Sequence, residues 1–155
     1  MNNKQLILDG SSVIIKITYN KDKSYYFYNF EWEEILCAFV YDISVQEDIV
    51  LDMFNKSKNN KKNGYKLLCF ALQWIKENKD LNKVKTVSLA SVPHKIDGKR
   101  DQERLNSYYR RIGFINNSDD HDFIQNIDSL IIQCKTKNTA TKMASGLMKP
   151  KSAKR

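Results

Sequence analysis

The sequence lacks any continuous apolar run of about 18 residues, the length that a membrane-spanning helix needs, so we expect no such helix. Its first ten residues, MNNKQLILDG, lack the long apolar stretch of a secretory signal. Cys37, Cys69 and Cys134 lie singly in apolar runs without a CxxC pair, which predicts reduced core thiols. These absences predict an intracellular, cytoplasmic protein with no membrane partner.

Several catalytic motifs are also missing. The absence of GxxxxGKS or GxxxxGKT excludes a mononucleotide-binding loop of that type, and there is no GxSxG or Ser-His-Asp signal. Carboxylates surround His121 in SDDHD, Ser118 to Asp122, but consecutive residues cannot all point at one ion. His94 follows Pro93 in a loop and is expected at the surface. We therefore expect no metal.

Charge is present, and it is unevenly distributed along the chain. Residues 135–155 hold seven basic side chains and no acid, whereas the rest of the chain holds 19 basic and 18 acidic side chains. This segment also has few large apolar groups, so we predict a domain at 1–134 and a basic, disordered tail at 135–155. The tail could bind nucleic acid or another polyanion by counterion release, or could only increase solubility, and both interpretations stay open.

The hydrophobic patterns predict an α/β fold in which at least two helices cover a sheet. Gly64 precedes one expected helix, which Asn78 ends, and Gly113 ends the second. The two helices are expected at 65–78 and 101–113. The strands are expected at Ser12–Tyr19, Ser24–Phe30, Ile35–Ile43, Glu47–Phe54, Val84–Ala90 and Ser129–Cys134.

Two stretches carry candidate chemistry. The polar loop KSKNNKKNG, residues 56–64, ends in Gly64 and opens a helix, which is the general geometry of an anion site. Its lysines add positive charge, although such a loop is often only solvated. The second stretch, YYRRIGF at 108–114, ends the other helix.

These stretches, with the order of elements from Ile35 to Cys134, resemble the GNAT superfamily of acetyl-CoA-dependent N-acetyltransferases. The family's pyrophosphate loop has Arg or Gln, two residues, Gly, one residue, and Gly or Ala, and here Asn59, Lys62 and Gly64 occupy those positions. The resemblance implies a GNAT-like mixed, mostly antiparallel sheet flanked by helices, with acetyl-CoA as co-substrate. It implies these cofactor-binding residues: Phe54, Asn59, Asn60, Lys61, Lys62, Asn63, Gly64 and Tyr65.

Two departures from the family bear on this resemblance. Lysine at position 62 resists backbone shapes that glycine permits, although its ammonium could bind phosphate directly. The two helices that the family places between its first strands are not evident, and residues 12–54 read almost entirely as strands. Those helices often shape the acceptor site.

The second stretch lies on the family's L-Y-x-x-x-G-F motif, with Tyr108 at the leucine position and Tyr109 at the tyrosine. The resemblance implies that Tyr109 protonates the leaving thiolate and that Tyr108 is a core residue; the alternative is that both only pack. Asp48 matches the general base of some members, with Glu47 and Asp52 as competing carboxylates. Alternation along the strand places Asp48 and Asp52 on one face.

We therefore predict an N-acetyltransferase in which an amine of unknown class attacks the thioester directly. Two alternatives remain open. One is a GNAT-like module that has lost catalysis and only binds, because most loop glycines are missing. The other is a protein that binds a polyanion through residues 135–155.

Overall fold

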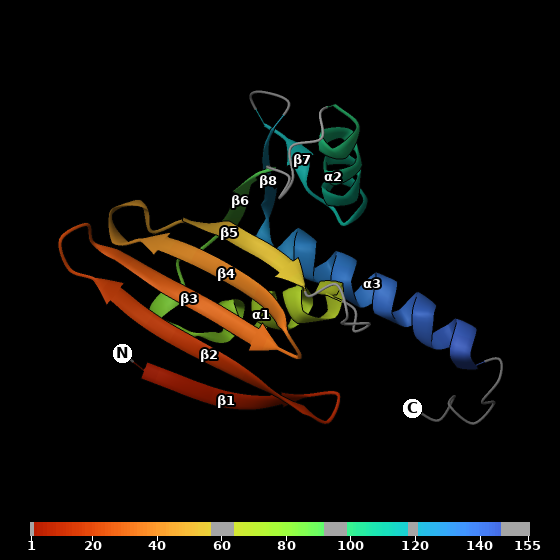
Figure 1. The fold of residues 1–155 in the computed structure, drawn as a ribbon, viewed down its shortest axis with the longest axis horizontal. Coiled ribbons are helices and arrows are strands. Elements are labelled where there is room, and N and C mark those ends of the chain that lie inside the picture. Colours follow the sequence, from red (N-terminus) through yellow and green to blue (C-terminus); the bar gives the residue numbers. More distant parts are fainter. Residues whose placement is uncertain (1, 57–63, 92–98, 118–120, 147–155) are drawn as a thin grey trace.

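The structure is a computed structural model of the chain, and it describes residues 2–56, 64–91, 99–117 and 121–146. An eight-stranded sheet has the order β1-β2-β3-β4-β5-β6-β8-β7, and three α-helices accompany it (Figure 1). The strands are β1 Asn2–Leu8, β2 Ser11–Asn20, β3 Tyr25–Trp32, β4 Ile35–Asp42, β5 Asp48–Lys56, β6 Thr86–Ala90, β7 Ile115–Asn116 and β8 Asp122–Asn126. The helices are α1 Gly64–Glu77, α2 Lys99–Arg111 and α3 Ile127–Gly146, with short 3-10 turns η1 Ile43–Val45 and η2 Lys79–Leu81.

Every neighbouring pair of strands is antiparallel except β5 and β6, which run parallel. Their parallel pairing covers only Asp48–Val50 against Thr86–Ser88. A bulge interrupts β5, because Phe39 faces Leu51 while the adjacent Ala38 faces Met53. Asp52 is therefore the extra residue, and the strict alternation that predicted a shared face for Asp48 and Asp52 does not hold there.

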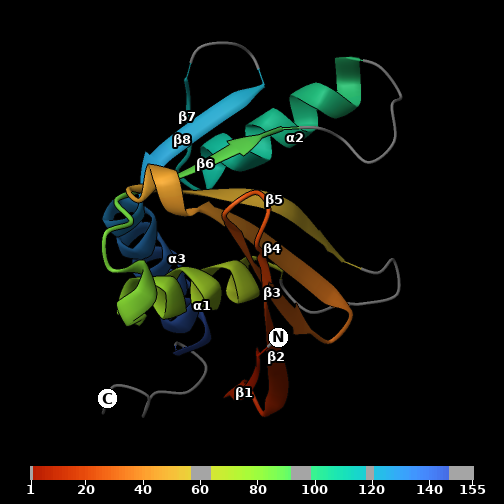
Figure 2. The same ribbon diagram turned by 90° about the vertical axis from the view of Figure 1, so that its left-hand side faces the viewer.

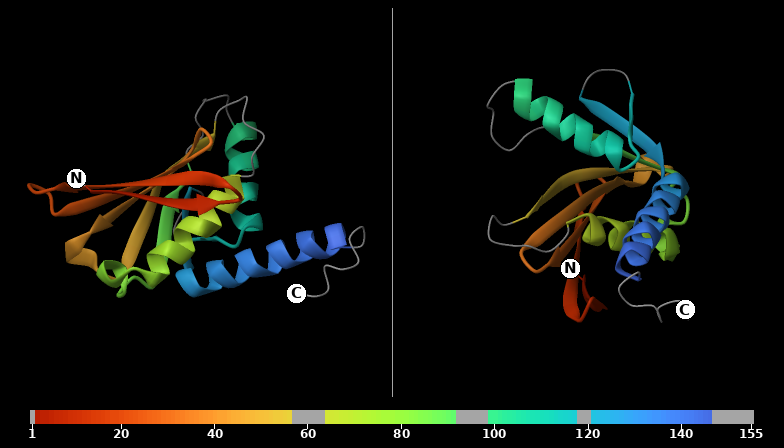
Figure 3. Two further views of the ribbon diagram at one scale, coloured as in Figure 1. Left: turned by 90° about the horizontal axis from the view of Figure 1, so that it is seen from below. Right: turned by 90° about the vertical axis from the view of Figure 1, so that its right-hand side faces the viewer.

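One face of the sheet carries the core. Tyr28, Phe30 and Trp32 alternate along β3 as buried residues, and α1 packs on this face through Trp74, whose ring lies 5.5 Å from that of Phe30. Helix α1 forms because its apolar residues recur at intervals of three or four residues, which places them on one face of the helix. Figures 2 and 3 show α1 and α3 on the same side of β3, β4 and β5. The buried residues of α1 are Leu67, Leu68, Cys69, Ala71, Leu72 and Ile75.

The C-terminal part of the chain corrects one expected element. Ser129–Cys134 was predicted as the closing strand, but it lies in α3. Its apolar run hides a helical spacing: Ile127, Leu130, Ile131 and Cys134 are the buried residues, at intervals of three, one and three. The closing strand is instead β8, which pairs with β6. Residues 135–146 belong to α3, and the separate role predicted for 135–155 as a tail stays a prediction.

The cysteines correct a second expectation. Cys69 on α1 and Cys134 on α3 form a disulfide with a Cα–Cα separation of 5.8 Å, whereas all three thiols were expected to be reduced. Their apolar surroundings are those of two packed helices, and a pairing between positions this far apart in sequence cannot be read from spacing alone. Cys37 is a free, buried thiol on β4.

The predicted fold class is confirmed: the chain is an α/β protein with a mixed, mostly antiparallel sheet flanked by helices, which is compatible with a GNAT-like fold. The first four predicted strands, both predicted helices and the strand ending at Ala90 all form, within a few residues of the expected bounds. Among the residues that the structure describes, no helix is both long enough and apolar enough to span a membrane.

Candidate functional site

The junction between β5 and β6 is where the sheet opens. The two parallel strands pair only as far as Val50 and Ser88, yet β5 continues to Lys56 on its β4 side. Within the described residues, the β6-facing edge of β5 beyond Val50 has no strand partner. Backbone donors and acceptors at such an edge are available to a ligand.

The N-terminus of α1 lies against this part of β5. A Cβ added to Gly64 would meet the ring of Phe54 at 3.4 Å and the Ile35 side chain at 3.9 Å. Glycine therefore allows the helix to begin close to the strand. Phe54 and Tyr65 are both half-buried and pack against the core. The first amides of α1 are consequently held next to the open edge of β5.

The end of α2 explains why Tyr109, Gly113 and Phe114 occur at these spacings. Gly113 has φ of +116°, which favours glycine. The Gly113 amide donates to the Arg110 carbonyl at 3.1 Å, and the Phe114 amide donates to the Tyr109 carbonyl at 3.0 Å. These are the two bonds of a Schellman motif, and the Tyr109 and Phe114 rings, 6.0 Å apart, make its apolar contact. The turn thus holds Tyr109 in place.

Tyr109 is a core residue with a titratable group. It is 8% exposed, and its ring lies 6.0 Å from that of Phe123 on β8. Burial raises the pKa of Tyr109 to about 12, with a smaller effect from Cys37. The phenol is therefore protonated at neutral pH, which is the state that a proton donor needs.

Tyr108 is less buried than Tyr109, the reverse of what the sequence predicted for the pair. Its ring lies 6.3 Å from the Phe54 ring on β5 and 5.5 Å from the Tyr109 ring. The Arg111 guanidinium lies over it, 5.6 Å from the ring centre. Burial raises the pKa of Tyr108, and Tyr109 and Tyr65 raise it further. Tyr108 therefore bridges α2 to the strand beside the start of α1.

Asp48 is fixed by hydroxyl donors from the neighbouring strand. Its carboxylate accepts hydrogen bonds from Thr86 Oγ1 at 2.6 Å and from Ser88 Oγ at 2.7 Å. The register puts Asp48, Thr86 and Ser88 on one sheet face, and their neighbours Ile49 and Val87 on the core face. Leu89 pairs with Phe123, so the Tyr109–Phe123 contact belongs to the core face. Asp48 and Tyr109 consequently lie on opposite faces of the sheet.

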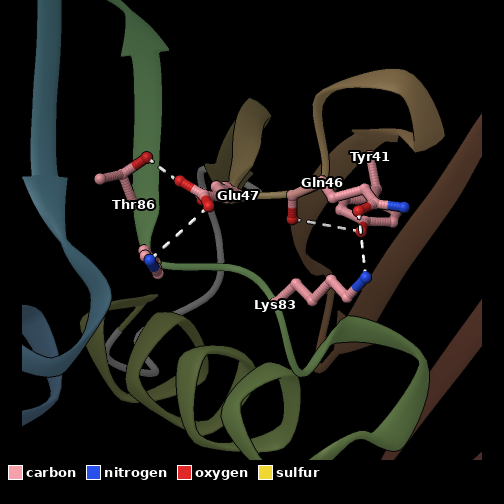
Figure 4. A network of polar contacts seen from close by, with 6 residues as sticks. Tyr41, Gln46, Glu47, Lys83 and Thr86 are labelled. Atoms are coloured by element: carbon pink, nitrogen blue, oxygen red, sulfur yellow. Dashed lines mark hydrogen bonds and ion pairs between the residues drawn. The ribbon is translucent and has the colours of Figure 1, made fainter.

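The competing carboxylates are differently placed. Glu47 is exposed, and its carboxylate pairs with Lys85 Nζ at 3.6 Å. The Glu47 carbonyl accepts bonds from the Lys85 and Thr86 amides at 2.7 and 3.0 Å. Figure 4 shows polar contacts of Glu47 beside the hydrogen bonds that Gln46 accepts from Tyr41 and Lys83. These bonds fix the chain just ahead of β5. Asp52, at the bulge, is exposed.

Sequence reasoning missed a buried polar cluster where β6 ends. Gln102 on α2 donates to the Ser91 carbonyl at 2.7 Å and to Asn106 Oδ1 at 2.9 Å. Ser91 is 0% and Asn106 5% exposed. The only sequence signal was an amide pair four residues apart on a helix, which is common on solvated faces. The cluster ties α2 to the end of β6, and so sets the position of the two tyrosines.

Several predicted site residues lie outside the described residues. They are Asn59, Asn60, Lys61, Lys62 and Asn63 of the loop, together with His94 and the first three residues of SDDHD. Within the described part of the chain, no group of three or more His, Cys, Asp or Glu side chains is placed to hold a metal ion.

Comparisons with known proteins add little. No family model matches the chain, and no curated protein matches it. Among solved structures the chain is similar to one described as the crystal structure of a KacTA-DNA complex, with 12% identity and a TM-score of 0.44, covering 82% of this chain and 72% of that chain. A likeness this low carries no argument about function.

Proposed function

We propose that the chain is an N-acetyltransferase that moves an acetyl group from acetyl-CoA to an amine by direct attack. The observation that carries the proposal is the opening between β5 and β6, beside the N-terminus of α1 and the tyrosines of α2. The resemblance of the sequence to acetyltransferases supports it, since Gly64 and the Tyr109–Phe114 turn carry the matching motifs.

The described residues fit acetyl-CoA in two respects. The amide groups of β5 beyond Val50, on the edge away from β4, can bond the peptide-like arm as a further strand would. The amides at the start of α1, with the helix dipole, attract a diphosphate, and no acidic residue lies in the first turn to oppose it. Lys66 is already paired with Asp9, so we assign it no phosphate contact.

Asp48 and Tyr109 would act from opposite sides of the sheet. Acetyl-CoA supplies the thioester, whose C–S bond breaks as the amine nitrogen bonds to the carbonyl carbon. Asp48 would take the proton that the amine loses, directly or through a water, and Thr86 and Ser88 hold its carboxylate for this role. Tyr109 would protonate the thiolate as the C–S bond breaks, because burial keeps its phenol protonated at neutral pH and the phenolate left behind takes a proton back from water.

Calorimetry with acetyl-CoA and a thiol-release assay across an amine panel test the proposal. We expect saturable binding below millimolar ligand, and thiol release that depends on the amine. Saturable binding without release from any amine would favour the module that has lost catalysis. If no saturable binding is observed at millimolar acetyl-CoA, the assignment as an N-acetyltransferase is wrong.

Binding of a polyanion through residues 135–155 stays a separate prediction. Deleting those residues should abolish salt-dependent nucleic-acid binding and leave any affinity for acetyl-CoA intact. Equal nucleic-acid binding by the truncated chain would contradict it.

A further inference from the structure

The face of the sheet opposite the core is not covered by any described helix. Strand register defines this surface, which we call the open face, as the side chains that alternate with the buried ones. Helix α1 packs against Phe30 on the other face, and α2 contacts Phe123, also on the other face. The open face comprises Ile14, Lys16 and Thr18 of β2, Tyr25, Phe27, Asn29 and Glu31 of β3, Leu36, Val40 and Asp42 of β4, with Ala38 buried between its larger neighbours, Asp48 and Val50 of β5, and Thr86, Ser88 and Ala90 of β6.

An apolar row crosses the centre of the open face. Phe27 pairs with Val40, and Val40 pairs with Val50, so three apolar side chains stand side by side on three strands. Val50 is 38% exposed, and Phe27 and Val40 are half-buried. The core lies on the other side of these strands, so packing of the core does not explain why apolar side chains stand on this face. Apolar rows with polar rims are typical of interaction sites.

The charge of the open face is opposite to that of the chain. The chain has 26 Lys and Arg residues against 18 acids, yet Lys16 is the only basic residue of the open face among the described residues. Lys16 is neutralised by Glu31 at 3.2 Å. Asp42 and Asp48 remain, each two residues along its strand from Val40 or Val50. The surface is therefore apolar at its centre and negative beside it on β4 and β5.

We propose that the open face docks an amphipathic, lysine-bearing polypeptide segment and that this segment is the acetyl acceptor. The acceptor role rests on the proposed function; the docking does not. The described helices pack against the core face, so the open face is the free approach to the junction of β5 and β6. Apolar side chains of the segment would cover Phe27, Val40 and Val50, and its lysines would face Asp42 and Asp48.

The extent of the surface favours a polypeptide over a small amine. Five strands about 4.8 Å apart span roughly 19 Å across β2 to β6. A small polyamine would use the carboxylates and leave the apolar row exposed to water, whereas an amphipathic helix or strand would cover both. Charge complementarity also selects a cationic partner over a second copy of this face, which would bring like charges together.

The docking is tested with a defined probe. The probe is a fluorescent, end-capped 15-residue peptide of Leu and Lys at helical spacing, and the matched peptide has Glu in place of Lys. We expect the Lys peptide to bind by fluorescence anisotropy without acetyl-CoA, more weakly at high salt, and the Glu peptide not to bind. Equal binding of the two peptides would overturn the proposal.

Paired variants locate the surface. Val50→Lys should weaken binding by about tenfold or more, whereas Ile132→Lys on α3, where Ile132 is 63% exposed, should not. Asp42→Asn should weaken it about threefold while keeping the acceptor that bonds the Ser44 amide. Its matched control is Asp128→Asn on α3. If Val50→Lys does not fold, the Asp42 pair still decides, and equal loss in test and control variants overturns the proposal.

Three further outcomes separate the alternatives. Peptide binding without acetyl transfer would support the docking and refute the proposed function. Transfer to small amines at a rate unaffected by Val50→Lys, with no peptide binding, would overturn the docking and leave the enzyme assignment intact. A dimer in solution that Val50→Lys dissociates would assign the face to a second copy and overturn the proposal.

Discussion

The two parts of the sheet on either side of the β5–β6 junction are built differently. Strands β1 to β5 form an uninterrupted antiparallel series, with ladders that run along most of each strand. Strands β6 to β8 join that series through only three parallel residue pairs. Of the largest fully buried side chains, Trp32, Phe30 and Phe39 lie in the first part and Phe123 in the second, where α2 packs on it through Tyr109.

This difference indicates that the strands that contribute most to the core are not the place where the proposed site lies. In the first part, strands β2 to β4 are paired on both sides along most of their length, whereas β5 beyond Val50 is paired only with β4 among the described residues. The residues that surround the proposed site, Phe54, Gly64, Tyr108 and Asp48, all lie where the two parts meet or diverge. Because few backbone hydrogen bonds join β5 to β6, backbone donors of β5 remain available to a ligand. Side chains such as Gln102 are then needed to hold α2 against the end of β6.

The largest expected effect comes from cutting the covalent tie between the two parts. The Cys69–Cys134 disulfide closes a sequence separation of 65 residues, from α1 in the first part to α3 after the second. Reducing it should lower the free energy of unfolding by about 4 kcal/mol, because the unfolded chain regains loop entropy. Urea unfolding with and without reductant measures this.

Thiol counting provides the control for that experiment. Under denaturing, non-reducing conditions one thiol should react, which is Cys37. Three should react after reduction. Three reactive thiols before reduction would refute the disulfide.

The next-largest effect should appear in the catalytic rate constant and not in the free energy of unfolding. Tyr109→Phe should lower kcat by about 100-fold, since general acid catalysis contributes that much or more. The ring packs against Phe114 and Phe123, and phenylalanine keeps those contacts. The free energy of unfolding should therefore change by less than about 1 kcal/mol. Tyr108→Phe is the matched control; an unchanged rate for Tyr109→Phe would remove it from the mechanism.

Alkaline pH should destabilise both parts, by an amount on the order of 1 kcal/mol. Burial raises the pKa of Tyr28 in the first part to about 12, with Asp80 adding to the shift, and burial raises the pKa of Tyr109 in the second to about 12. In the unfolded chain these phenols ionise near about pH 10. Stability is thus fully present below about pH 10 and is lost as pH rises towards 12.

Urea unfolding at about pH 8 and about pH 11, on either side of the unfolded phenol pKa, measures this loss. Tyr28→Phe and Tyr109→Phe should each reduce the pH dependence, since each removes one phenol whose ionisation favours unfolding. A pH dependence identical to that of the unaltered chain in both variants would contradict the assignment.

How much the sequence could predict follows the same division. The alternating pattern of β2 to β5 and the helical spacing of α1 predict those elements, because one buried face fixes each period. The short strands β7 and β8 escaped prediction, since Ile115–Asn116 is too short to show a period. Apolar β-branched residues in Ser129–Cys134 resembled a strand more strongly than the real one, Asp122–Asn126.

The site was predictable only where local geometry leaves a sequence mark. Gly113 with Phe114 signals a helix end, and this turn positions Tyr109. The burial order of Tyr108 and Tyr109 depends instead on β5 and β8, which are distant in sequence. The hydroxyl partners of Asp48 lie about 40 residues along the chain, so no local pattern could reveal them.

The smallest expected effect on stability comes from a substitution where the start of α1 meets β5. Gly64→Ala would place a Cβ 3.4 Å from the Phe54 ring, an ordinary contact at its near limit, and alanine favours the helix. The free energy of unfolding should shift by less than about 0.5 kcal/mol. Affinity for acetyl-CoA should nevertheless fall, because the methyl group stands at the helix start proposed to receive the diphosphate. Glycine elsewhere offers the contrast: Gly10→Ala, where nothing lies within 4 Å of the added Cβ but φ is +82°, should cost stability and spare affinity. If both variants keep full affinity, the α1 N-terminus is not the diphosphate site, and the junction must be assigned another ligand.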